Sequence, residues 1–324
     1  KPEFETLPLP GKNFEKRLVD IRWHTVEEQV SFPKILEKEN LDLVHFPYFS
    51  FPLRYKGKFV ITIHDLILHH FSTGKASTLP KFVYVAKLAS YKFIIKYAAK
   101  HAEKIIAVSN ATRDEIVSHL NVPAEKVVVT YEGFDSAIAR HKEKVSNLPR
   151  KYFLYVGNAY PHKNIERLIE SFELADLPDC HLLFVGREDF FYQRLKKHIT
   201  NPNIHFYHEV SDSELAYVYE HAIATVIPSL MEGFGLPALE AMAHTCPLIV
   251  SDIPVLHEVC KDAAVYFDPL DTHALAERLE SVYKEKNNKQ IQAGLRRVKD
   301  FSWEKMAQET LDVYEGAEGT KETR

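Results

Sequence analysis

The second half of the chain alternates short apolar runs with helical patterns, and this alternation constrains the fold more than any other feature. The first run ends at Gly157 and the second at Gly186. Six runs predict strands, at 152–156, 181–185, 204–207, 224–227, 248–250 and 264–267. Helical patterns lie at 165–174, 192–198, 213–222, 237–244, 254–259 and 272–286. Strands that alternate with helices predict an α/β domain whose parallel sheet is covered on both faces.

This arrangement also predicts where a ligand binds. Right-handed crossovers place the carboxyl ends of the strands at one edge of a parallel sheet. In open α/β sheets, ligands bind outside that edge. The loops that follow Val156, Val185, Tyr207 and Ile227 are therefore the segments in which we look for chemistry.

The first half shows the same alternation more weakly. Strands are predicted at 18–21, 43–46, 59–63, 105–108 and 127–130, and helices at 26–39, 81–102 and 111–120. Ser109 or Asn110 is a natural N-cap for the last of these helices. A polar stretch at 139–149 separates the two halves, and a length of 324 residues suits two domains.

The composition argues against several classes of protein. A formal net charge of -4 disfavours a general nucleic-acid binder, which normally carries a basic excess. The three cysteines, Cys180, Cys246 and Cys260, form no C-x-x-C pair and are interpreted as reduced thiols in the core of a cytosolic protein. No apolar run approaches the roughly 18 residues of a membrane span, and the start has no signal-peptide pattern. We therefore expect a cytoplasmic protein.

The densest chemical signal is the segment 229–242, which follows the run ending at Ile227 and enters the predicted helix at 237–244. Gly233 and Gly235 allow the backbone to approach a ligand closely. The free N–H groups of such a turn and of the helix N-terminus suit a phosphate. Glu232 and Glu240 flank the turn and suit hydroxyl recognition. The alternative is that Glu232 is an ordinary loop residue and Glu240 an exposed helix residue.

Two further segments carry chemistry. Lys163 lies just before a predicted helix N-terminus, where a fixed cation suits a diphosphate and the charge that builds on it as it leaves. His64 and Asp65 follow an apolar strand, so His64 can bind a substrate hydroxyl or phosphate, with Asp65 orienting it. The alternatives are a solvated lysine and a histidine that satisfies a local hydrogen bond. The sequence has no Asp-x-Asp pair to hold a divalent cation against a diphosphate, so we expect no metal and no cofactor.

Taken together, these residues give the chain a resemblance to glycosyltransferase family 4, the retaining enzymes of GT-B architecture. Glu232-Gly-Phe-Gly-Leu-Pro-Ala-Leu-Glu240 is similar to the family's E-x7-E motif. The other matching pieces are 156–164, 62–65, 108–112, 131–135 and 301–304. The resemblance extends from about Leu41 to Tyr314.

The resemblance implies two Rossmann-like domains that face a cleft. Residues 1–145 would form the acceptor-side domain, residues 146–300 the domain that binds the nucleotide-sugar, and residues 301–316 a closing helix that returns to the first domain. The transition state would be oxocarbenium-like. A diphosphate oxygen would take the proton of the acceptor.

The resemblance also implies roles for individual residues. Glu232, Lys163 and His64 would be the catalytic group, with Lys163 on the diphosphate and His64 reaching the transferred sugar. Glu240 would hold the ribose, and the loop at 208–210 would receive the base. The implied donor-binding residues are Gly157, Asn158, Arg187, Val210, Gly233, Phe234, Gly235, Leu236 and Glu240.

Two features depart from the family pattern. Asn158 stands where the family usually has an arginine, which removes one cation from the diphosphate site. Only about 17 residues precede the predicted strand at 18–21, so the first domain is expected to lack its first βα unit. An exposed apolar sheet edge would then need cover from another chain, for instance in a homo-oligomer, or from a rearrangement.

The leading hypothesis is a retaining glycosyltransferase that moves a mannose- or glucose-type sugar from a GDP- or UDP-sugar to a glycan or lipid-linked acceptor. The alternatives are a nucleotide-sugar epimerase of the same architecture and a truncated, catalytically weak protein that only binds nucleotides or nucleotide-sugars. Lysines spaced by four, at Lys92, Lys96, Lys100 and Lys104, form a stripe that is either a solvated face or a contact with anionic lipid. Peripheral contact with the inner membrane surface therefore stays open.

Overall fold

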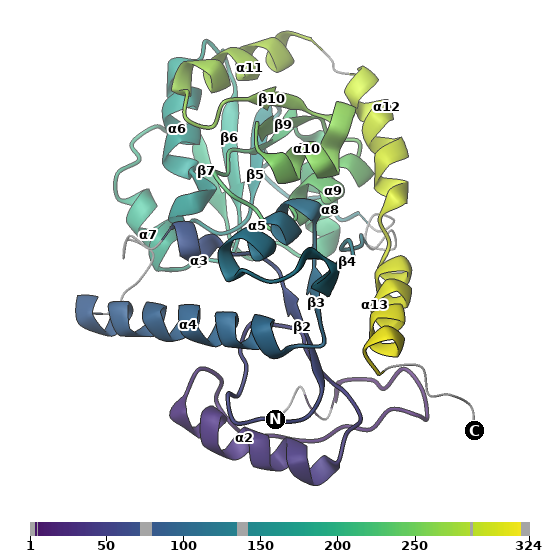
Figure 1. Cartoon of the computed structure of the whole chain (residues 1–324). Helices are drawn as coiled ribbons and strands as arrows, with labels where there is room; N and C mark the ends of the chain where they lie inside the picture. Colours follow the sequence, from purple (N-terminus) through teal and green to yellow (C-terminus); the bar gives the residue numbers. More distant parts are fainter. Residues whose placement is uncertain (1–3, 5, 72–79, 135–141, 286–287, 319–324) are drawn as a thin grey trace.

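The structure is a computed structural model that describes residue 4 and residues 6–71, 80–134, 142–285 and 288–318. These residues form two parallel sheets with helices packed against them (Figure 1). The first sheet has the order β1-β2-β3-β4, with β1 at Val44–Phe46, β2 at Phe59–Ile63, β3 at Lys104–Ala107 and β4 at Val127–Val129. The second has the order β10-β9-β8-β5-β6-β7, with β5 at Tyr152–Val156, β6 at His181–Val185, β7 at Ile204–Tyr207, β8 at Ala224–Ile227, β9 at Leu248–Ser251 and β10 at Val265–Phe267.

Helices follow most of the strands. Around the first sheet these are α2 (Val26–Glu39), α3 (Ile67–His70), α4 (Lys81–His101) and α5 (Asn110–Leu120). Around the second they are α6 (Ile165–Leu174), α7 (Phe190–Lys196), α8 (Asp212–His221), α9 (Leu236–Ala243), α10 (Pro254–Cys260), α11 (Thr272–Lys284) and α12 (Asn288–Arg297). The last helix is α13 (Trp303–Glu318). The predicted α/β fold with two Rossmann-like domains is therefore confirmed, most element ends lying within two residues of the prediction.

Local sequence explains where several helices begin. Ser109 is the N-cap of α5, and its hydroxyl accepts a hydrogen bond from the backbone N–H of Thr112. Ser211 and Glu214 form a capping box at the start of α8. These side chains satisfy backbone N–H groups that have no partner inside the helix.

Helices bury both faces of the second sheet. Successive side chains of each strand point to opposite faces, so they join different apolar clusters. In β5, Tyr152 and Leu154 pack into the cluster that contains α9 and α10. Phe153 and Tyr155 pack into the opposite cluster, with α6 and α11. The near-continuous apolar character of these strands follows from burial on two sides.

The first sheet is covered by different parts of the chain on its two faces. One face packs with α4 and α5 in a large apolar cluster. On the other face, Val60 and Ile106 pack against Val313 and Ala317 of α13. The ring of His45 is 2.5 Å from the Tyr314 hydroxyl, measured from Nδ1. The end of the chain thus returns from the second sheet to the first, as the yellow α13 shows in Figure 1.

The prediction of a strand at 18–21 is wrong. Residues 17–22 have no regular secondary structure, and Leu18 is 53% exposed. The run is short and lies between charged side chains, of which Arg17 pairs with Glu15 and Glu39 in solvent. Its apolar side chains are exposed or only half-buried, so burial does not stabilise a strand there. The apolar side chains of the edge strand β1 are not exposed: Val44 and Phe46 are buried.

No helix in the described part of the chain has both the length and the apolar character that crossing a membrane requires.

Candidate active site

The strand order of the second sheet locates a crevice. From β5 the chain builds outward through β6 and β7, then returns to place β8 on the other side of β5. The connections leaving β5 and β8 therefore diverge at their carboxyl ends, and such a switch point is where open α/β sheets bind ligands. The segments 157–164 and 228–235 follow these two strands.

Asn164 joins the two loops at this point. Its backbone lies in the left-handed region, with a φ of 57°, and its side-chain amide donates hydrogen bonds to the carbonyls of Pro228 (3.0 Å) and Pro269 (2.9 Å). The backbone N–H of Leu230 donates to the carbonyl of His162 at 2.8 Å. These bonds hold the residue before Asn164 close to the residues that follow β8.

That residue is Lys163, and it forms an ion pair with Glu232. Its Nζ lies 2.7 Å from Oε1 and 2.8 Å from Oε2 of the carboxylate, and the Ser229 hydroxyl donates to Oε1 at 2.6 Å. The two charged side chains are only 16% and 10% exposed. Withdrawing two charges from water is costly, so a shielded pair is weak evidence for a contribution to stability. Its position at the switch point makes it a candidate for binding a charged ligand.

The glycine turn after Glu232 contacts the first domain. An added Cβ at Gly233 would lie 2.2 Å from the backbone oxygen of His64. The Gly233 carbonyl accepts hydrogen bonds from Ser109 (2.7 Å) and Thr112 (3.0 Å). Gly235 has a φ of 98° at the start of α9, a conformation that favours glycine. The close contact between the domains therefore explains why residue 233 is a glycine, and the sequence alone did not show this contact.

The partner of His64 differs from the predicted one. Its Nδ1 lies 3.1 Å from the carboxylate of Glu132, and its Nε2 lies 3.1 Å from the carbonyl oxygen of Pro47. The Asp65 carboxylate instead accepts from the backbone N–H of Ile67 at 2.9 Å. The expectation that Asp65 orients His64 is thus wrong, because adjacent residues after the strand point to different neighbours.

The contacts of His64 predict that the stability of the folded chain depends on pH. The hydrogen bond to Glu132 raises the pKa of His64 above the ordinary value of 6.5, more than burial lowers it. The folded chain therefore holds this proton more tightly than the unfolded chain, so the stabilisation is complete below the ordinary value and is lost as pH rises through the raised pKa. We expect Glu132→Gln to return the His64 pKa toward 6.5 and to flatten this part of the stability profile. Titration of the imidazole by NMR and urea unfolding across this range measure both effects, and an unchanged His64 pKa would show that Glu132 is not the cause.

Glu240 lines a pocket of about 120 Å³ between the two domains. The Tyr219 hydroxyl donates to its Oε2 at 2.7 Å. Burial raises the pKa of this carboxyl. The other lining residues come from α8, from α9 with the residue after it, and from two junctions of the chain, and they are Gly133, Phe134, Asp212, Leu215, Ala216, Tyr219, Leu236, His244 and Trp303. Glu240 is therefore a half-buried carboxylate that faces a cavity, unlike the exposed helix residue of the alternative hypothesis.

The other residues predicted for the site differ in their contacts and in their exposure to solvent. The carbonyl of Gly157 accepts from the Tyr192 hydroxyl at 2.7 Å, and that of Asn158 from the Tyr155 hydroxyl at 2.6 Å. Arg187 is exposed after β6. Phe234 is 3% exposed and packs in the core, so only its backbone is available to a ligand.

The loop after β7 holds a polar atom without a partner. His208 Nδ1 lies 2.7 Å from the carbonyl oxygen of Gly186, and its Nε2 is buried with no hydrogen-bond partner among the described residues. Val210, two residues later, is half-buried against the core of the second domain. A buried imidazole nitrogen of this kind is available to a polar ligand group at this edge of the sheet.

Sequence reasoning missed Glu258. Its carboxylate accepts from the backbone N–H groups of Asn110 (2.7 Å) and Ala111 (3.0 Å), so it caps α5 from the other domain. An anion at a helix N-terminus is stabilised by the unpaired N–H groups there. No local pattern around Glu258 signals this role, because its partners lie on a different domain.

Comparisons with known proteins agree with this geometry. Two families match the chain: glycosyl transferases group 1 over residues 137–297 and Glycosyltransferase Family 4 over residues 9–137. The O-antigen chain mannosyltransferase RfbU of Salmonella typhimurium is 30% identical over 282 residues, which are 86% of this chain and 75% of that protein.

Many solved structures share the fold, among them a sucrose-phosphate synthase and HepE. The sucrose-phosphate synthase of Thermosynechococcus elongatus has a TM-score of 0.72 at 21% identity, covering 88% of this chain and 76% of that one. HepE of Anabaena, solved in complex with UDP, has a TM-score of 0.69 at 17% identity, covering 87% and 80%. By sequence and by fold, the chain belongs to the family 4 glycosyltransferases, enzymes of GT-B architecture that transfer a glycosyl group.

Proposed function

We propose that this glycosyltransferase moves a mannosyl group, with retention at the anomeric carbon, from a nucleoside-diphosphate mannose to a glycan acceptor. The observation that carries the proposal is the Lys163–Glu232 pair at the switch point of the second sheet, beside the turn that contacts His64. The choice of mannose rests on the similarity to RfbU, which is named as a mannosyltransferase of the O-antigen chain. A growing polysaccharide is accordingly the acceptor class that we favour.

In this proposal the donor replaces contacts that side chains of the site make with one another. Lys163 turns from Glu232 toward the diphosphate, and Glu232 is then free to accept hydrogen bonds from the hydroxyls of the sugar. The backbone of 233–236 lies before and within the first turn of α9, where N–H groups without helical partners suit the diphosphate. Because Lys163 and these N–H groups neutralise the leaving diphosphate, the proposal needs no metal ion there.

The remaining residues of the site bind the ribose, the base, the phosphates and the transferred sugar of the donor. Glu240 holds the ribose hydroxyls in the pocket between the domains. The base lies against the loop of His208 and Val210, with Arg187 at its rim and Gly157 and Asn158 beneath the phosphates. His64 faces the transferred sugar from the first domain, with its ring held by Glu132 and the Pro47 carbonyl.

Calorimetry with GDP, UDP and ADP, followed by transfer assays with the matching mannose and glucose donors, tests this function. We expect selective binding of one nucleotide and mannosyl transfer to a lipid-linked glycan with the anomeric configuration retained. Donor hydrolysis without transfer, or epimerised donor as the product, would contradict the proposal. Binding without any reaction of the donor would identify a nucleotide-binding protein instead.

Glu240→Gln provides a prediction with opposite effects on stability and binding. A carboxyl whose pKa is raised by burial favours the protonated form when folded, so its contribution to stability declines as pH rises from the ordinary value of 4.5 through the raised pKa. The neutral amide should therefore raise the melting temperature at pH 7 without nucleotide. The loss of a charged hydrogen-bond acceptor for ribose should weaken nucleotide binding by about 10–100-fold.

Thermal unfolding and calorimetry measure the two effects, and Glu220→Gln is the matched control. Glu220 is an exposed glutamate of α8, and its pair with Lys142 lies in solvent. We expect the control to leave nucleotide affinity unchanged. Equal affinity of Glu240→Gln and the natural chain would place the ribose elsewhere.

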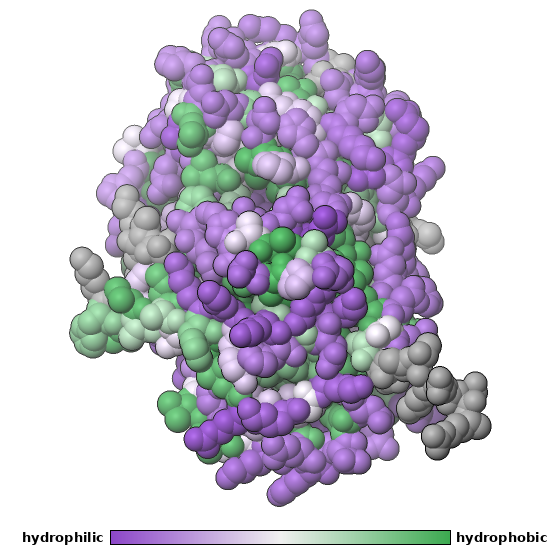
Figure 2. Space-filling model, viewed as in Figure 1, coloured by the Kyte–Doolittle hydropathy of each residue, from purple (hydrophilic) through white to green (hydrophobic). Residues whose placement is uncertain are grey.

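We also propose that α4 contacts an anionic membrane surface that carries the acceptor. Three exposed apolar side chains of this helix, Phe82 (77%), Val85 (55%) and Phe93 (61%), share one side with the exposed Lys92 and Lys96 at 3.6 residues per turn. Figure 2 shows hydrophobic surface on the end of α4 that projects from the body. Mixed basic and apolar side chains on one helix face are typical of interfacial binding.

Sedimentation with vesicles measures this contact. Replacing Lys92, Lys96 and Lys100 by glutamine should lower binding to vesicles that contain anionic phospholipid by about 100-fold, given about 1 kcal/mol for each lysine near the surface. Neutral vesicles should bind little of either protein. Replacing Lys284, Lys289 and Lys299 changes the net charge equally on the other domain, and an equal loss of binding in that control would refute a specific role for α4.

A further inference from the structure

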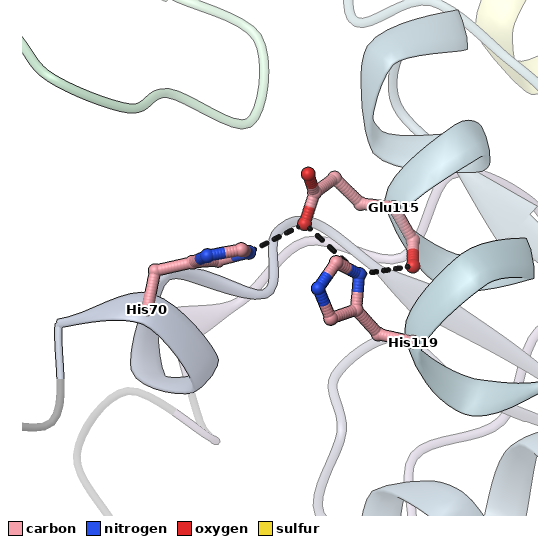
Figure 3. Close-up of side chains that lie close together, drawn as sticks. All are labelled: His70, Glu115 and His119. Carbon is pink, nitrogen blue, oxygen red and sulfur yellow. Dashed lines mark hydrogen bonds and ion pairs between the residues drawn. The ribbon is translucent and has the colours of Figure 1, made fainter.

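Three side chains of the first domain converge away from the donor site. His70 ends α3, and Glu115 and His119 lie one turn apart on α5, so each ring faces the same carboxylate (Figure 3). His70 Nε2 is 2.6 Å from Glu115 Oε2, and His119 Nδ1 is 3.4 Å from the same oxygen. All three ligand atoms lie within 4.8 Å of one another.

The donor set fits a divalent transition-metal ion such as Zn²⁺. Two imidazoles and a carboxylate are ligands that Zn²⁺ takes at about 2.0–2.2 Å, with a fourth position left to water. Tetrahedral ligand atoms around such an ion are separated by more than the 2.6 Å between His70 and Glu115. A zinc ion would therefore replace that hydrogen bond by moving the side chains apart slightly. Their side chains are 36%, 32% and 38% exposed, so an ion can enter from solvent.

The helix orients one of these ligands in advance. His119 Nδ1 lies 3.1 Å from the backbone oxygen of Glu115 and 3.0 Å from the Ser118 hydroxyl. Nδ1 is thus held beside both the backbone oxygen and the carboxylate of Glu115, so the ring lies next to the other ligands before a metal binds. The centroids of the His119 and His70 rings are 4.9 Å apart.

We propose that His70, Glu115 and His119 bind a Zn²⁺ ion that joins α3 to α5. Both segments lie next to the second domain: α3 follows His64 and Asp65, and the start of α5 receives Glu258 and the Gly233 carbonyl. The ion would hold these two segments in one arrangement. It is separate from the diphosphate chemistry, which Lys163 and the turn at 233–236 serve without it.

Titration of Zn²⁺ alone into the whole chain, in competition with a chromophoric chelator, tests the site. We expect one ion per chain and a melting temperature that rises with zinc concentration. His70→Ala, His119→Ala and Glu115→Gln should each weaken binding by at least about 10–100-fold, since outer-shell changes alone have effects of that size. Co²⁺ offered instead of Zn²⁺ should give the visible absorption bands of a four-coordinate ion, and each variant should lose them.

His101→Ala is the matched control, because His101 Nδ1 also lies close to the backbone oxygen four residues earlier, at 2.8 Å from Tyr97. This control should bind zinc like the natural chain. Circular dichroism and melting without metal show whether each variant folds, and the cobalt bands report coordination independently of stability. Equal zinc affinity in the His70, His119 and His101 variants would overturn the proposal, and so would the lack of any bound ion.

Discussion

Replacing Lys163 by methionine is expected to lower kcat for sugar transfer by about 10²–10³-fold, the usual effect of removing one group that stabilises transition-state charge. Lys163 Nζ is only 2.7–2.8 Å from both oxygens of Glu232, so the structure fixes where this cation lies. Methionine has a similar length and keeps the packing, but it removes the charge that we propose faces the departing diphosphate. Steady-state kinetics with the natural donor measures the loss.

The experiment has to separate a loss of catalysis from a loss of stability. Without Lys163, the shielded carboxylate of Glu232 loses its cation, and breaking such a pair costs about 3 kcal/mol or more. The double variant Lys163→Met/Glu232→Gln removes both charges and should regain much of the stability while staying inactive. Lys142→Met breaks an exposed lysine–glutamate pair with Glu220 and should cost at most about 1 kcal/mol with full activity. Transfer at the natural rate by the folded double variant would remove Lys163 from the mechanism.

Gly233→Ala is expected to have the second largest effect, a fall of about 10²-fold in kcat/KM, the scale of a misplacement by about 1 Å. The new Cβ would lie 2.2 Å from the backbone oxygen of His64 and 3.3 Å from the Asp65 side chain. Backbone cannot give way as a flexible side chain can, so the two domains have to separate. The Gly233 carbonyl then loses the hydroxyls of Ser109 and Thr112.

Small-angle scattering and kinetics together test this prediction. We expect a larger radius of gyration and lower activity, while circular dichroism shows both domains folded. Gly316→Ala is the matched control, because an added Cβ there meets no atom of the described residues within 4 Å and Gly316 lies inside α13. That change should leave activity intact and stabilise the helix by about 0.5–1 kcal/mol. Unchanged scattering and full activity of Gly233→Ala would show that the contact with His64 is dispensable.

Much of the fold follows from local pattern. The buried strands β5, β6 and β8 are almost entirely apolar because helices cover both faces of their sheet, and such runs are visible without any tertiary information. The same pattern predicts that loops after different strands meet at one edge. Lys163 and Glu232 are 69 residues apart, and the structure does bring them into contact.

Other features could not be predicted in this way. The run at 18–21 has strand-like composition, but a strand also needs a buried face, and Leu18 is 53% exposed. The predicted partner of His64 was its neighbour Asp65, whereas the observed partner, Glu132, is 68 residues away. Sequence proximity is a poor guide to side-chain contact at a strand end, because successive side chains diverge.

The sequence by itself determined the two parallel-sheet domains and the loops that carry Lys163, Glu232 and Glu240, because periodicity and turn chemistry are local properties of the chain. The family followed from the resemblance of the motifs in these loops. Only the tertiary structure decided which groups meet across the domains. Glu258 caps α5 over a separation of 148 residues, and Gly233 packs on the backbone of His64. His70 meets Glu115 and His119 only because α3 packs beside α5. Such contacts depend on how whole elements are placed in space, and no residue carries that information in its own neighbourhood.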